Sequence, residues 1–166
     1  MKLCRLLFLI TAWSPFSFGQ SLELIYSQKI LGESVEIISK NFGKPIKISE
    51  SKKLLNIWEK KDWDDCYLYQ SKDITLVINI KDNKSTLFAV WKKSPDEHVN
   101  DGKPWTEDEV KRIVDLNAPG HIWTKMALEP GGEIYYANET GTMAYQISPD
   151  GTQLTMMDSM PQPAGR

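Results

Sequence analysis

A single cysteine and two histidines are the side chains in this chain best suited to nucleophilic chemistry. Beyond an N-terminal leader, Cys66 is the only cysteine, and His98 and His121 are the only histidines. A thiol becomes an efficient nucleophile when an imidazole lies within hydrogen-bond reach of its sulfur. No catalytic motif surrounds these residues, and free cysteines are usually buried. We therefore expect a buried Cys66 and a protein that is not an enzyme, with a small secreted hydrolase or thiol-dependent enzyme centred on Cys66 and His121 as the alternative.

One polar segment alternates in the manner of a calcium-binding loop. Its donors are Asp96, His98, Asn100 and Asp101. A calcium loop needs its glycine and its terminal glutamate in one register. The glycine here is displaced to position 102, so the two requirements are not met together. We interpret the segment as solvated charge and predict neither a metal nor a cofactor.

Aromatic rings are interleaved with charged residues between positions 58 and 69. The rings are Trp58, Trp63, Tyr67 and Tyr69. Aromatic anchors set among charges are typical of protein interfaces. Such rings also fill the cores of small sheets, so the core is the alternative for any one of them. We predict that these four rings bind a protein partner.

The first 19 residues have the pattern of a cleaved signal peptide. Lys2 and Arg5 precede an apolar run, and small residues stand at positions 17–19. Pro15 interrupts the run before the length of about 20 apolar residues that a spanning helix needs. We expect export to the periplasm or the extracellular space, without stable membrane insertion after cleavage.

Cleavage leaves residues 20–166, a length of 147 residues that allows a substantial core. The leader holds two of the 20 basic residues and none of the 22 acidic ones, so the mature chain carries 18 against 22. A net negative charge without a dense basic run argues against nucleic acid as a partner. With one cysteine left, no internal disulfide can form, and packing alone has to hold the fold.

Residues 20–93 predict a first unit of one helix followed by strands. Apolar residues recur at helical spacing from Val35 to Phe42, and Gly43 and Pro45 end the helix. Strands are expected at 53–58, 66–69, 74–81 and 86–91, with a turn at 82–85 and with 74–81 burying one face. The segment 22–30 fits either a short helix or an edge strand.

Residues 94–104 are polar and contain two prolines, which predicts a linker. A second unit over 105–158 begins with a helix, because Thr106 and Glu109 form a capping box. Strands are expected at 122–128, 133–137, 142–147 and 153–157. The proline-containing tail 159–166 is expected to be disordered.

The fold class expected from this order is α+β, with two helix-plus-antiparallel-meander units that could share one sheet. Each helix should cover one face of its meander and leave the other face open. That open face, together with the four rings, is where we expect a protein partner to bind.

The first helix also carries a pattern known from a protein family. Its residues are Gly32, Ser34, Ile38, Phe42, Gly43 and Pro45. In order and spacing this resembles the motif that opens modules of the small outer-membrane assembly lipoproteins, the BamE or SmpA/OmlA family. The architecture is also similar to that of β-lactamase-inhibitory proteins. The resemblance covers about residues 30–92 and implies an envelope protein that binds proteins without catalysis. The remainder resembles uncharacterised exported bacterial proteins.

Overall fold

The computed structural model of the chain describes residues 21–48, 65–71, 73–93, 102–127, 133–138 and 142–158. The helices of this part are α1 (Ser21–Ile25), α2 (Val35–Phe42) and α4 (Glu107–Asn117). The strands are β1 (Ile46–Ile48), β2 (Asp65–Gln70), β3 (Ile74–Lys81), β4 (Lys84–Lys93), β5 (Gly102–Lys103), β6 (Trp123–Ala127), β7 (Glu133–Ala137), β8 (Met143–Ile147) and β9 (Gln153–Asp158). No described helix is long and apolar enough to cross a membrane.

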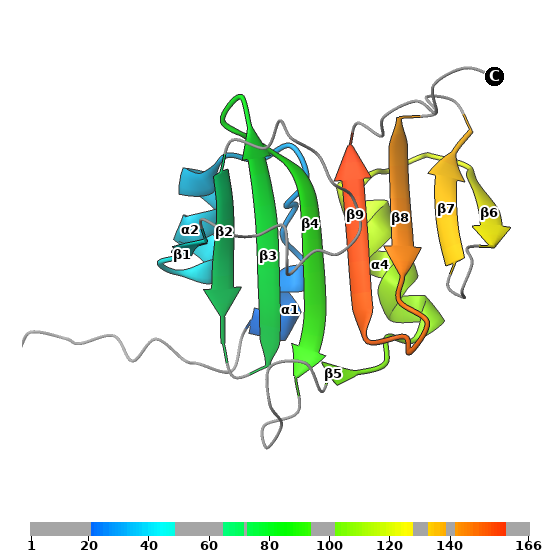
Figure 1. Cartoon of the computed structure of the whole chain (residues 1–166), viewed down its shortest axis with the longest axis horizontal. Coiled ribbons are helices and arrows are strands. Elements are labelled where there is room, and N and C mark those ends of the chain that lie inside the picture. The colour runs from blue at the N-terminus through cyan, green and yellow to red at the C-terminus, as the bar shows by residue number, and fades with distance from the viewer. Residues whose placement is uncertain are drawn as a thin grey trace, which may run out of the picture.

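All nine strands belong to one antiparallel sheet, which confirms the predicted α+β class. The order is β1-β2-β3-β4-β9-β8-β7-β6, and β5 pairs with β4. The two meanders therefore meet through their last strands, with Ala89 of β4 opposite Thr155 of β9. Figure 1 shows β4 and β9 side by side at the centre of the sheet. The two units share one sheet, as the sequence allowed.

The β3–β4 hairpin forms where its sequence predicts it. Asp82 and Asn83 connect the strands with φ values of 52° and 59°, a conformation that tight hairpin turns require and that Asp and Asn tolerate. The burial pattern of β3 differs from the prediction. Both faces of this strand are buried, because Leu76 and Ile78 pack in the helix-side cluster while Val77 packs in a second apolar cluster on the other face.

Helix α2 begins and ends as its sequence indicates. The Ser34 side chain accepts a hydrogen bond from the Ile37 backbone N–H at 3.4 Å. Gly43 follows the helix with a positive φ of 86°, which favours glycine. The ambiguous segment before it contains the short helix α1 rather than an edge strand.

Helix α4 begins with the predicted capping box and packs beside the N-terminal segment. The Thr106 side chain and the Glu109 side chain each bond the other's backbone N–H. At the other end, the buried Asn117 accepts hydrogen bonds from the backbone N–H groups of Ile30 and Leu31 at 2.8 and 2.9 Å. Residues from the two halves of the chain are thus joined inside one core.

The helices lie on one face of the sheet, behind the strands in Figure 1. This face carries the larger core cluster, which includes Ile38 of α2, Ile113 of α4 and Phe88 of β4. Its strand residues include Ile74, Leu76 and Ile78 of β3 and Leu154 and Met156 of β9. The helices therefore cover both meanders from the same side.

The other face of the sheet is not bare at its centre, which corrects the expectation of an open surface. Val77, Ala89 and Ile134 are fully buried there, in a second apolar cluster that also contains Cys66. No described helix lies on this face (Figure 1). The cluster has polar neighbours as well, since Thr75 and Asn79 are buried on the same face of β3.

The predicted linker 94–104 contains a short strand near its end. Gly102 and Lys103 form β5, which pairs with Lys93 and Lys92 at the end of β4. The rest of that segment, residues 94–101, lies outside the described residues, as do the leader, the strand expected at 53–58 and the tail 159–166.

Candidate functional site

Two of the four rings predicted to bind a partner lie within the described residues, and both lie on β2. Tyr69 is only 3% exposed, contacts Phe42 edge-on at 6.2 Å between ring centroids, and its hydroxyl lies 3.0 Å from Ser39 Oγ. Tyr67 is partly buried against the same helix-side cluster. The expectation of an exposed ring is therefore corrected for Tyr69, which fills the core under α2. Trp58 and Trp63 lie outside the described residues.

Cys66 and His121 do not form a catalytic pair. Cys66 is 3% exposed, as expected, and its Sγ lies 3.8 Å from Asn79 Oδ1 in the cluster away from the helices. His121 lies on the helix side, next to β6. Six strand spacings of about 4.8 Å separate β2 from β6, or roughly 29 Å. The alternative enzyme centred on Cys66 and His121 therefore lacks its base. His98 lies outside the described residues.

Within the described part of the chain, no three of the His, Cys, Asp and Glu side chains come together in a way that could hold an ion. The calcium-loop-like segment from Asp96 to Asp101 lies outside that part.

The structure instead forms a groove of about 660 Å³ between α4 and the strands β6, β7 and β8. A volume of this size falls within the range of ligand-binding clefts. Its wall from α4 and the residue before the capping box comprises Trp105, Glu107, Val110, Lys111, Val114 and Asp115. Its sheet side comprises His121, Trp123, Lys125, Glu133, Tyr135, Tyr145 and Ile147. We call this site the α4 groove.

Aromatic rings form a continuous row along the sheet side of the α4 groove. Tyr135 and Tyr145 stand opposite each other on β7 and β8 and stack at 4.5 Å with an interplanar angle of 4°. Trp123 meets Tyr145 edge-on at 4.9 Å, and His121 meets Trp123 at 5.9 Å. Such contacts fix ring positions beyond what burial alone provides. The row is therefore an ordered aromatic surface.

Charged side chains alternate in sign around these rings. Lys125 pairs with Glu133, and Lys111 pairs with Asp115 one helical turn further along α4. The Tyr135 hydroxyl donates a hydrogen bond of 2.6 Å to Glu133 Oε2. Glu107 makes no ion pair within the described residues, although it lines the same groove. The charged lining thus has one more carboxylate than it has ammonium groups.

Burial, hydrogen bonds and the nearby carboxylates shift the pKa values of several side chains in the groove. Burial first, and then the hydrogen bond to Glu133 and the nearby Glu107, raises the pKa of Tyr135 to about 12. Burial also raises the pKa of Tyr145 to about 12, and the carboxylates around it act in the same direction. The hydrogen bond from Lys125 holds the pKa of Glu133 below its usual range. Both tyrosines are neutral and Glu133 is charged near neutral pH.

One polar atom at this site is unused. Trp123 Nε1 is shielded from solvent and has no hydrogen-bond partner. A buried donor without a partner carries a desolvation cost. The indole is therefore held in place by its packing against Tyr145 and His121 rather than by a hydrogen bond.

A partly buried polar cluster fixes α4 relative to the first half of the chain. Glu109 accepts hydrogen bonds from Lys92 Nζ at 2.7 Å and from the Tyr26 hydroxyl at 2.7 Å. Lys92 also lies 5.1 Å from the centre of the Trp105 ring, at the end of the α4 groove. Trp105 Nε1 in turn donates to the Thr152 carbonyl oxygen at 3.0 Å. These contacts position the helix that forms one wall of the groove.

Apolar side chains are exposed on the edge strand beside the groove. Met126 of β6 is 53% exposed, and Ile122, which precedes the strand, is 65% exposed. β6 is the last strand of the sheet on this side. Met126 follows Lys125 along β6, so its side chain lies on the sheet face opposite the α4 groove.

Sequence reasoning missed this site because it placed the binding rings between residues 58 and 69. The signal that was present is alternation: 123 and 125, 133 and 135, and 145 and 147 each place two groove residues on one face of a strand. Only the observed register, with Lys125 opposite Tyr135 and Tyr135 opposite Tyr145, brings them into one row.

Comparison with known proteins gives no family for the chain. No protein-family model matches the sequence, and no curated protein matches it. A solved structure of a cysteine-rich secretory protein from Staphylococcus aureus aligns with 77% of this chain and 43% of its own, at 8% identity and a TM-score of 0.37. The chain thus spans less than half of that protein, and this TM-score does not define a shared fold. The resemblance of residues 30–92 to the BamE family stays a prediction.

Proposed function

We propose that the protein is an exported, non-enzymatic binding protein of the cell envelope or extracellular space, and that it binds another protein through the α4 groove. The observation that carries the proposal is the row of ordered rings, Trp123, Tyr145 and Tyr135, in a groove with a charged rim. Aromatic anchors with charged neighbours are characteristic of protein interfaces.

Export is supported by the leader pattern of the sequence. Basic residues, an apolar run and small residues follow one another in the order that signal peptidases recognise. The mature chain would then carry a single, buried cysteine, which suits a protein that has to remain unreactive in an oxidising compartment.

A binding role fits the described residues better than a catalytic one. The Cys66 thiol is buried on the face away from the helices, and His121 in the α4 groove contacts the Trp123 ring. The groove offers ion pairs and rings, which select and hold a partner, rather than a nucleophile paired with a base.

Affinity capture tests the proposal. The tagged protein would be incubated with an envelope extract of its source cells, beside the variants Tyr145→Ala and Trp123→Ala. The control is Trp91→Ala, which removes a partly buried ring packed against the cluster on the opposite face of the sheet. We expect a discrete captured protein that both groove variants lose and that the folded control retains. Equal capture by all four proteins would contradict the proposal.

A further inference from the structure

The α4 groove also indicates which chemical group of a partner it holds. Resting on the proposed function above, we infer that the groove accepts the guanidinium group of an arginine side chain from the partner protein. Two features of the groove carry this inference: an uncompensated carboxylate and aromatic rings that attract cations.

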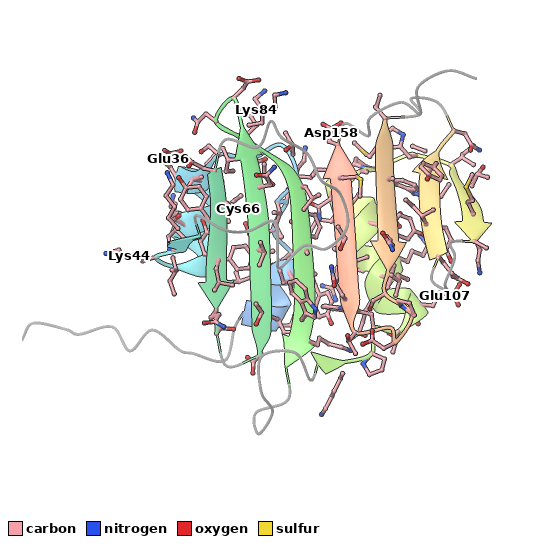
Figure 2. All side chains as sticks on the ribbon, in the orientation of Figure 1. Glu36, Lys44, Cys66, Lys84, Glu107 and Asp158 are labelled. Atoms are coloured by element: carbon pink, nitrogen blue, oxygen red, sulfur yellow. The ribbon has the colours of Figure 1, made fainter. Side chains whose placement is uncertain are left out.

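The charge of the lining favours a cation. Its carboxylates are Glu107, Asp115 and Glu133, and its ammonium groups are those of Lys111 and Lys125. The two lysines already pair with two of the carboxylates, which leaves Glu107. In Figure 2 Glu107 lies at the end of α4 near the β6–β7 side of the sheet, far from Cys66. A positively charged group bound here would supply the missing counter-charge.

The rings of the groove already hold cations from the protein itself. Lys92 Nζ lies 5.1 Å from the centre of the Trp105 ring, and Lys125 Nζ lies 5.9 Å from that of Tyr135. These distances are those of cation–π contacts. No described cation occupies Tyr145 or Trp123 in the same way. Trp123 therefore carries no cation from the described residues, whereas one face of Tyr145 is covered by the stacked Tyr135.

Arginine fits this surface better than lysine. A planar guanidinium stacks on aromatic rings and donates several hydrogen bonds in one plane, whereas an ammonium group is a compact and strongly hydrated charge. One face of Tyr145 is covered by the stacked Tyr135, so Trp123 is the groove ring available to a guanidinium group, and Glu107 lines the same groove as a hydrogen-bond acceptor. Burial is the main cause of the raised pKa of Tyr145, and nearby carboxylates including Glu107 act in the same direction.

Nuclear magnetic resonance of the full chain tests the inference. The probe is the capped pentapeptide Gly-Gly-Arg-Gly-Gly, compared with the same peptide containing citrulline, which keeps the shape of arginine but lacks its charge. The indole N–H signal of Trp123, identified by its loss in Trp123→Phe, reports on the groove. We expect the arginine peptide to shift this signal in a saturable and salt-sensitive manner, and the citrulline peptide to shift it much less.

Charge variants complete the test. Glu107→Gln should weaken binding of the arginine peptide by roughly threefold to fivefold, because it removes one solvent-screened ion pair. Asp108→Asn removes the next carboxylate of the same helical turn, which does not line the groove, and should leave binding unchanged. Equal shifts from both peptides, or equal effects of both variants, would overturn the inference. So would a larger shift from tetramethylammonium, which would indicate a small cationic ligand.

The two proposals fail separately. Protein capture that depends on Tyr145, combined with no preference for arginine over citrulline, would overturn the arginine inference and keep the protein-binding function. If no captured protein depends on Tyr145, the protein-binding function itself is overturned, whatever the peptides do.

Discussion

Single polar atoms inside the sheet have unequal surroundings, and their energetic roles should differ accordingly. Thr75 and Thr155 are both buried, at 3% and 1% exposure. Thr75 Oγ1 has no hydrogen-bond partner, whereas Thr155 Oγ1 accepts a bond of 2.9 Å from Gln153 Nε2. A buried hydroxyl without a partner costs free energy, while one with a partner contributes modestly.

This contrast gives a matched pair of substitutions. We expect Thr75→Val to leave the free energy of unfolding unchanged or to raise it by about 1 kcal/mol, and Thr155→Val to lower it by about 1 kcal/mol. Urea denaturation of the two variants measures the difference. A greater loss of stability in Thr75→Val than in Thr155→Val would show that the Thr75 hydroxyl has a partner in solution.

Glu109 makes stability depend on acidity. Partial burial opposes its ionisation, but hydrogen bonds from Lys92, Thr106 and Tyr26 prevail and lower its pKa from 4.5 to about 2. A carboxyl group whose pKa is lowered in the folded state stabilises the protein. This stabilisation is fully present at pH values above the group's pKa in the unfolded chain. That contribution is lost as the pH falls from about 4.5 towards 2.

We therefore expect the wild-type protein to lose more stability than Glu109→Gln when the pH is lowered from about 6 to about 3. Denaturant titrations at the two pH values measure this loss for each protein. The control is Asp108→Asn, which removes an exposed carboxylate in the first turn of the same helix. An identical loss in wild type and Glu109→Gln would contradict the assigned hydrogen bonds.

At the scale of elements, the C-terminal turn of α4 is tied to the N-terminal segment by one side chain. Asn117 Oδ1 accepts from two backbone N–H groups, and its Nδ2 donates to the Ile113 carbonyl oxygen at 2.9 Å. We expect Asn117→Ala to lower the free energy of unfolding by about 2–4 kcal/mol, because it leaves two buried donors without an acceptor.

The comparison for Asn117→Ala is Asp115→Ala on the same helix. Asp115 pairs with Lys111 at the surface, where such pairs contribute little. Thermal and urea unfolding should show a small effect for Asp115→Ala and a large one for Asn117→Ala. Similar effects would mean that the turn at residues 30–31 does not depend on α4.

Sequence patterns predicted the elements far better than their surroundings. Helical spacing and caps identified α2 and α4, and alternation identified β3 and β7, because these signals are local. The role of Tyr69 and the burial of Val77 depend on which elements cover them. The α4 groove depends on the register between β6, β7 and β8. The spacing of residues along one segment therefore predicts neither the burial of Tyr69 and Val77 nor the α4 groove.

At the scale of the whole molecule, the β4–β9 pairing makes the two meanders one structure. The register places Phe88 against Met156 and Val90 against Leu154, and all four side chains are buried on the helix side. A core shared across this junction should not unfold in two separate parts.

We expect Leu154→Ala to destabilise both halves together, by about 2–5 kcal/mol. Hydrogen exchange of β3 amides reports on the first half, and tryptophan fluorescence of a variant keeping only Trp123 reports on the second. The two probes should give coincident denaturation curves. A first half that stays protected while the second half unfolds would show that the meanders are independent domains.

Photocrosslinking from the groove tests the central claim most directly. A photoreactive phenylalanine would replace Lys111 on the rim of the α4 groove or, as the control, Lys84 at the start of β4 in the remote hairpin. We predict a discrete protein adduct from position 111 in source cells, absent from position 84 and lost when Tyr145→Ala is added. Adducts of equal yield from both positions, or an adduct from position 111 that survives Tyr145→Ala, would contradict the claim that this groove binds the partner.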